Sequence, residues 1–137
     1  ARIFSSPSLK TCALGYVSDE KRIAVIYNAA DIYVLPSVED NLPNTIMEAM
    51  ACGVPCVGFR TGGIPEMIDH GKNGYVADFR KADDLAAGMH RLLCGDDYEA
   101  MSRAAVSKVH THYSQQSVAM RYIEVYNETA AMKKYII

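Results

Sequence analysis

Short apolar runs alternate with longer helical stretches over most of the chain. The short runs lie within 11–17 and at 32–35, 56–59 and 74–77, and each is predicted to be a strand. The longer stretches predict helices over 20–30, 45–52, 82–93, 98–113 and 115–134, with a short helical turn at 65–69. Because the strands lack alternating polar residues, we expect a parallel sheet that is covered on both faces.

Capping and breaking residues set the ends of these elements. Ser18 or Asp19 can cap the first helix. Gly53 stops the second helix, and Pro55 prevents it from resuming. The expected class is therefore α/β, with a Rossmann-like, doubly wound parallel sheet. Ligands of such sheets bind at the carboxyl ends of the strands, where loops lead into helices.

The composition allows one domain with a hydrophobic core and argues against a nucleic-acid partner. The chain has 137 residues, 50% of them hydrophobic, and its formal net charge of −2 provides no strong basic field. No apolar run reaches about 18 residues, so only peripheral membrane attachment stays open. The N-terminal residues do not resemble a secretion signal, and the four cysteines are interpreted as buried free thiols. We therefore expect a cytoplasmic protein.

The polar loop at 35–44 is the first candidate site, because it follows a strand and opens directly into a helix. Helix N-termini present unpaired backbone N–H groups and a partial positive charge, which suit phosphate. The alternative is an ordinary capped loop, in which Asn41 or Asn44 satisfies the first turn.

Glu48 is the second candidate, since it is the only charged residue between 45 and 58. The helix around it is otherwise apolar, so we expect it to be largely buried. A buried carboxylate needs a partner, and vicinal hydroxyls of a ligand can supply one. The alternative is a position at the solvent edge, or a pair with Arg60 or Lys72. Asp40 is expected at the mouth of the same crevice, where its carboxylate can accept hydrogen bonds from sugar hydroxyls. The alternative is a solvated acid that precedes a helix and complements its dipole.

The segment 36–55 closely resembles the donor-site motif of the retaining glycosyltransferases with the GT-B fold, family four, also called glycosyl transferases group 1. That motif is an acid, seven residues, Glu, and then Ala-Met-Ala-Cys-Gly-x-Pro, which this chain carries. The stretches 62–66 and 71–74 are similar to the next two markers of the family. The resemblance covers about 14–93. It implies a partial donor-binding domain over 1–137, with a core at 11–94 and C-terminal helices at 98–137.

The resemblance assigns roles residue by residue. Glu48 matches the acid that holds the nucleotide ribose, and Asp40 matches the catalytic acid that contacts the donor sugar. Gly15 and Tyr16 match the strand end near the base. The loop whose backbone approaches sugar and diphosphate matches Asn41, Leu42, Pro43, Asn44 and Thr45.

The chain also departs from the family pattern. The first acid is usually Glu, and the loop after it is often Gly-Phe-Gly, so the sequence does not select the donor sugar. An Arg and a Lys that grip the diphosphate early in the family's domain are not matched here. We therefore expect an N-terminally truncated half of the enzyme, inactive alone, whose acceptor-binding N-terminal domain is missing. Apolar residues left exposed on its last helix, around Tyr126, Met132 and 136–137, favour self-association.

The resemblance implies a hexosyltransferase that moves a sugar from a nucleotide diphosphate, uridine or guanosine, to an acceptor hydroxyl with retention. The resemblance also implies that no cofactor and no metal take part, and the acid pairs at 83–84 and 96–97 are consistent with this because they fit helix caps. His110 and His112 are expected at the surface.

Several alternatives stay open. One is another GT-B enzyme, such as a phosphorylase-like protein or a sugar-nucleotide epimerase. A second is a non-catalytic nucleotide-sugar-binding or assembly module. A dinucleotide-binding oxidoreductase is disfavoured, because no glycine-rich loop follows a first strand.

Overall fold

Helices separate the strands along the chain, much as the hydrophobic pattern predicts. The computed structural model describes residues 10–133. The elements are α1 (Glu20–Asn28), β1 (Tyr33–Leu35), α2 (Asn44–Ala51), β2 (Cys56–Phe59), α3 (Ile64–Met67), β3 (Gly74–Ala77), α4 (Ala82–Cys94), α5 (Tyr98–His112) and α6 (Gln115–Lys133). Asp19 caps α1, because its Oδ1 accepts from the backbone N–H of Arg22 at 2.7 Å. The predicted cap is therefore confirmed.

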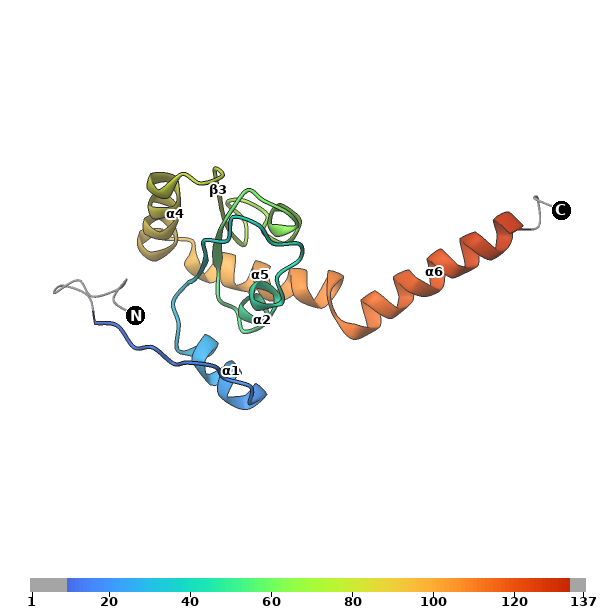
Figure 1. Cartoon of the computed structure of the whole chain (residues 1–137), viewed down its shortest axis with the longest axis horizontal. Helices are drawn as coiled ribbons and strands as arrows, with labels where there is room; N and C mark the ends of the chain where they lie inside the picture. Colours follow the sequence, from blue (N-terminus) through green and yellow to red (C-terminus); the bar gives the residue numbers. More distant parts are fainter. Residues whose placement is uncertain (1–9, 134–137) are drawn as a thin grey trace.

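The strands form one parallel sheet in the order β1-β2-β3. Val34 pairs with Val57, which pairs with Tyr75, and this row packs with Leu92 beneath α4. The neighbouring strand positions face the opposite side, where residues of α2, α3 and α5 form the larger core. Helices thus cover both faces, with α4 on one side and α2 on the other (Figure 1). The helix α5 contributes to both clusters, with Met101 beside Leu92 and Ala105 in the larger core. The predicted doubly wound α/β class is confirmed.

The predicted strand within 11–17 does not form. Residues 10–19 have no helix or strand conformation, and among residues 10–133 no backbone hydrogen bond joins this segment to β1. Gly15 adopts the left-handed region with φ 66°, which interrupts the extended backbone in the middle of the run. Leu14 and Tyr16 are consequently exposed rather than buried.

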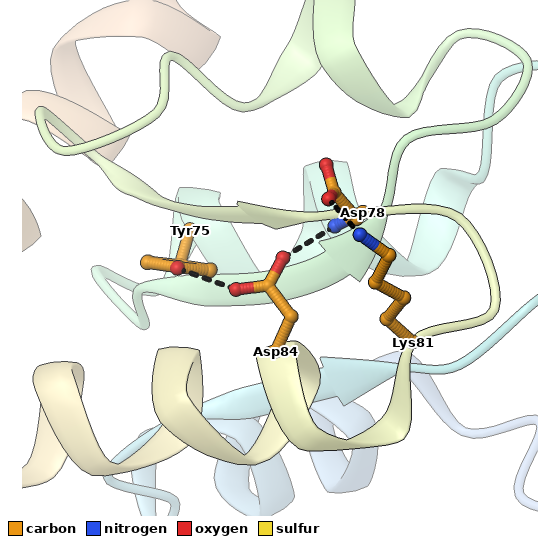
Figure 2. Close-up of polar contacts among 4 residues, drawn as sticks. All are labelled: Tyr75, Asp78, Lys81 and Asp84. Carbon is orange, nitrogen blue, oxygen red and sulfur yellow. Dashed lines mark hydrogen bonds and ion pairs between the residues drawn. The ribbon is translucent and has the colours of Figure 1, made fainter.

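The connection from β3 to α4 is fixed by Asp84 (Figure 2). Its Oδ1 accepts from the Tyr75 hydroxyl at 2.8 Å, and its Oδ2 accepts from the backbone N–H of Asp78 at 2.6 Å. Lys81 pairs with the Asp78 carboxylate at 2.8 Å. Asp84 therefore ties the strand and the loop to the start of the helix. Asp97 occupies the N-cap position of α5, as expected, but its side chain makes no cap hydrogen bond and pairs with Arg91, with two contacts of 2.7 Å.

The helix α6 extends away from the rest of the molecule (Figure 1). Tyr126 is 67% exposed and Met132 is 66% exposed, which confirms the expected apolar surface at these residues, while 136–137 lie outside the described residues. Within residues 10–133, no helix combines the length and apolar character that a membrane span requires. The cysteines are free, but only Cys56 is buried, and Cys12 and Cys94 are exposed, so the expectation of buried thiols is wrong for those two.

Candidate functional site

The loops that follow β1 and β2 lock together at the carboxyl edge of the sheet. The Thr61 hydroxyl donates to the Val38 carbonyl at 3.2 Å, and the Gly63 N–H donates to the Asn41 carbonyl at 2.5 Å. A Cβ atom at Gly62 would lie 1.6 Å from the Asp40 carbonyl oxygen. The absence of side chains at 62–63 therefore lets the loop that carries Asp40 settle on its neighbour.

The helix α2 begins at this edge without a side-chain cap. Pro43 occupies the N-cap position, and neither Asn41 nor Asn44 bonds to the first turn within the described residues. The alternative of an asparagine-capped loop is therefore wrong. An uncapped helix start presents backbone N–H groups together with the positive end of the helix dipole.

Glu48 lies on the exposed side of α2, which corrects the expectation of a largely buried helix. The residues that are buried in α2 are Ile46, Ala49 and Met50. The remaining face of α2 is exposed to solvent. Alanine and threonine occur in both exposed and buried positions, so the apolar composition of the helix overestimated its burial. The Glu48 Oε2 accepts a hydrogen bond from the Tyr27 hydroxyl at 3.2 Å. The alternative of a position at the solvent edge is therefore confirmed, whereas a pair of Glu48 with Arg60 or Lys72 is not found among residues 10–133.

A cleft of about 470 Å³ lies between the segment 14–17, α1, β1 and α2. Its walls are largely aliphatic and aromatic, and Thr45 and Glu48 are the polar groups that α2 contributes. The lining residues are Leu14, Gly15, Val17, Ile23, Ile26, Tyr27, Ala30, Tyr33, Thr45 and Glu48. A concave apolar site with a few convergent polar groups is typical of small-molecule binding.

Comparison with known proteins identifies the family. Residues 7–95 match the family described as Glycosyl transferases group 1. The chain belongs to this family. It is 30% identical over 112 residues to an N-acetyl-alpha-D-glucosaminyl L-malate synthase of Bacillus anthracis, covering 81% of this chain and 29% of that protein. The chain thus spans under a third of the length of the curated relatives that it matches first.

Solved structures of glycosyltransferases share the fold. A sucrose-phosphate synthase of Thermosynechococcus elongatus superposes with a TM-score of 0.73 at 24% identity, covering 84% of this chain and 29% of that chain. The HepE protein of Anabaena, solved in complex with UDP-glucose, gives a TM-score of 0.64 at 22% identity, covering 85% of this chain and 31% of that chain. At such identities the likeness shows the fold, which is the α/β fold of GT-B glycosyltransferases.

The structure brings some of the residues predicted for a glycosyltransferase site together and leaves others apart. Gly15, Thr45 and Glu48 line the same cleft. Tyr16 points away, with 96% of its surface exposed. Leu42 lines a separate hollow of about 380 Å³ beside α6. The other loop residues follow the sheet edge outside the cleft lining, with Asp40 half-buried, Pro43 buried, and Asn41 and Asn44 exposed.

Two tyrosines that line the cleft were not singled out by the sequence analysis. Tyr27 and Tyr33 meet edge to face, with ring centroids 5.7 Å apart and an interplanar angle of 79°. Burial, followed by Tyr33 and Glu48, raises the pKa of Tyr27. Burial also raises the pKa of Tyr33, and the Glu48 and Asp40 carboxylates act in the same direction. Tyrosine hydroxyls are protonated at neutral pH, and these shifts move their ionisation further into the alkaline range. The sequence contains one feature that could have drawn attention to Tyr27, namely its hydroxyl on a helix face that is otherwise aliphatic.

Groups that could hold a metal ion were also considered. Within residues 10–133, no three His, Cys, Asp or Glu side chains gather closely enough to do so. His110 and His112 are exposed on the last turn of α5, as expected.

Proposed function

We propose that this chain binds the nucleotide diphosphate of an activated sugar, as part of a hexosyltransferase that transfers the sugar to an acceptor hydroxyl with retention. The observation that carries the proposal is the position of Glu48 and Thr45. Both face one apolar cleft from the first two turns of a helix whose start has no side-chain cap. Such a cleft offers a carboxylate for hydroxyls and a helix N-terminus for phosphate within one turn of each other.

Glu48 is the proposed ribose ligand. Tyr27 occupies its Oε2, and among the described residues no hydrogen bond occupies Oε1. One carboxylate can accept several hydrogen bonds, so a 2′,3′-diol can be held while the tyrosine contact persists. Gly15, on the opposite wall of the cleft, has space for a ligand, since no heavy atom lies within 4 Å of the point where its Cβ would be. We assign the base to the neighbourhood of Gly15 and not to Tyr16, which is exposed and outside the cleft lining.

The diphosphate and sugar are assigned to the start of α2 and the loop 40–44. The exposed Asn44 and Thr45 supply backbone N–H groups there, and the half-buried Asp40 contacts the donor sugar in this proposal. The HepE structure, which contains UDP-glucose, supports a nucleotide sugar as the ligand of this fold. The relatives are much longer than this chain, so we assign the acceptor-binding residues to another part of the enzyme.

The proposed mechanism relies on orientation and charge stabilisation. The cleft would hold the donor so that its anomeric carbon faces the acceptor, and helix N–H groups would stabilise charge that develops on the leaving diphosphate. We propose that neither a metal ion nor another cofactor takes part.

Calorimetric titration tests this proposal directly. The chain is titrated with UDP, GDP and their glucose and mannose conjugates, with and without magnesium. We expect binding that selects one base and does not change with magnesium. Binding only in the presence of magnesium would contradict the metal-independent mechanism, and no binding at millimolar nucleotide would contradict a donor site formed by this chain.

A further inference from the structure

The contact between Tyr27 and Glu48 connects α1 to α2, two helices that both contribute to the cleft wall. Tyr27 lies in the last turn of α1, and Glu48 lies in the middle of α2. The hydroxyl donates to Oε2 at 3.2 Å. Both residues border the 470 Å³ cleft.

Glu48 also borders a second hollow, which shares Ile23 and Tyr27 with the first. That hollow, of about 300 Å³, is lined by Glu20, Ile23, Ala24, Tyr27, Glu48, Ala51 and Cys52. The exposed carboxylate of Glu48 therefore has two hollows within reach, and only one of them contains Gly15 and Thr45. A glutamate side chain has three rotatable bonds. A ligand that binds only one of its conformations therefore binds more weakly, because fixing the side chain costs conformational entropy.

Packing against neighbouring side chains restricts the half-buried Tyr27. Its ring meets Tyr33 of β1 edge to face at 5.7 Å, and it packs against the larger hydrophobic core. Its hydroxyl is a donor at neutral pH, as in any tyrosine, and burial raises its pKa further.

We propose that Tyr27 is a positioning residue for nucleotide recognition, which fixes one oxygen of Glu48 so that the other faces the ribose. The inference rests on the proposed function of Glu48. The hydroxyl of Tyr27 touches the carboxylate and not the nucleotide. Its contribution is consequently visible only with ligands that carry the ribose diol.

The test compares UDP with 2′,3′-dideoxy-UDP on the full chain by calorimetry. Tyr27→Phe removes the hydroxyl and retains the ring that packs on Tyr33. We expect wild type to bind UDP more tightly than the dideoxy nucleotide. We expect Tyr27→Phe to lose about fivefold in UDP affinity and to bind the dideoxy nucleotide unchanged. Tyr98→Phe is the matched control, because its hydroxyl donates to the Asp31 carbonyl at 2.8 Å outside the cleft. It should leave both affinities unchanged.

A double-mutant cycle separates positioning from a general loss of structure. In the Glu48→Gln background, Tyr27→Phe should cost no further UDP affinity, because the carboxylate that it positions is gone. Affinities are referred to the folded fraction, measured by circular dichroism. If wild type discriminates between the two nucleotides and Tyr27→Phe discriminates equally well, the positioning role is overturned while the ribose role of Glu48 stands. If wild type binds both nucleotides equally, the ribose role itself is overturned.

Discussion

The backbone of Gly62 lies against the carbonyl of Asp40 more closely than any side chain would allow. A Cβ atom there would be 1.6 Å from the carbonyl oxygen, and the φ of 49° already disfavours an L side chain. The loop that carries Asp40, which is proposed to contact the donor sugar, is thus shaped by Gly62. Asp40 follows β1, whereas Gly62 follows β2.

Gly62→Ala should therefore destabilise the fold by more than about 3 kcal/mol, through backbone strain and a clash with main-chain atoms. Gly71→Ala is the matched control, since its φ is 77° but no atom lies within 4 Å of its Cβ position. It should lose only about 1–2 kcal/mol from the left-handed backbone. Urea unfolding measures both values. Equal losses in the two variants would show that the clash with Asp40 is relieved by a small shift.

Asn73, in the segment 71–74 that resembles a family marker, has a structural role. It is 1% exposed, and its Oδ1 accepts from the backbone N–H of Asp69 at 2.9 Å. Asn73→Ala should lower the free energy of unfolding by about 1–3 kcal/mol, because it removes the acceptor of that bond. The exposed neighbour Lys72 provides the control, since Lys72→Ala should change stability by less than about 0.5 kcal/mol. A loss below that bound for Asn73→Ala would argue that water replaces the amide.

Patterns in the sequence predicted β2 and β3 with their observed ends. Short, continuous apolar runs that are bounded by turn residues strongly favour buried strands. The pattern failed at 11–17, where the conformation of Gly15 breaks the run. It failed again at Glu48, because the alanines and threonine of α2 fit either environment. The contact of Tyr27 with Glu48 spans 21 residues and depends on how α1 packs beside α2. Spacing alone does not encode such packing, so the motif indicated Glu48 but not its partner.

Asp84 makes the stability of the β3–α4 connection depend on pH. Its pKa is lowered, first by the Asp78 N–H and then by the Tyr75 hydroxyl. A lowered pKa means that the carboxylate stabilises the fold above its ordinary value near 3.8, and that this contribution is lost as the pH falls through the folded-state value. Asp84→Asn should therefore reduce stability at pH 7, with a difference from wild type that shrinks on acidification.

Asp83→Asn is the control for this pH effect. Asp83 shares the first turn of α4 and hence the helix dipole, but makes neither hydrogen bond. Thermal unfolding over about five pH units, from about pH 7 to about pH 2, reaches the range below the ordinary Asp pKa where the contribution of Asp84 is lost, and it measures both variants. Matching profiles would assign the effect to the dipole and not to the bonds of Asp84.

Asp40→Asn tests the proposed contact with the donor sugar. The carboxylate lies on the loop at the sheet edge and not in the lining of the cleft that holds Glu48. The substitution should weaken the sugar nucleotide roughly tenfold and leave the bare nucleoside diphosphate nearly unchanged, because only the sugar hydroxyls lose a charged acceptor. Glu39→Gln, on the exposed side of the same loop, should leave both affinities unchanged. An equal loss for both ligands in Asp40→Asn would remove the sugar role.

Glu48→Gln separates recognition from stability at the centre of the cleft. Because Glu48 is exposed and its contact with Tyr27 is a single solvent-exposed hydrogen bond of 3.2 Å, the free energy of unfolding should change by less than about 0.5 kcal/mol. Nucleotide affinity should nevertheless fall roughly tenfold, since a neutral amide is a weaker acceptor for the ribose hydroxyls than a carboxylate. Calorimetry and urea unfolding of the same preparation measure the two quantities together. Severe unfolding, with unchanged affinity for each folded molecule, would instead make Glu48 a structural acid that ties α2 to α1.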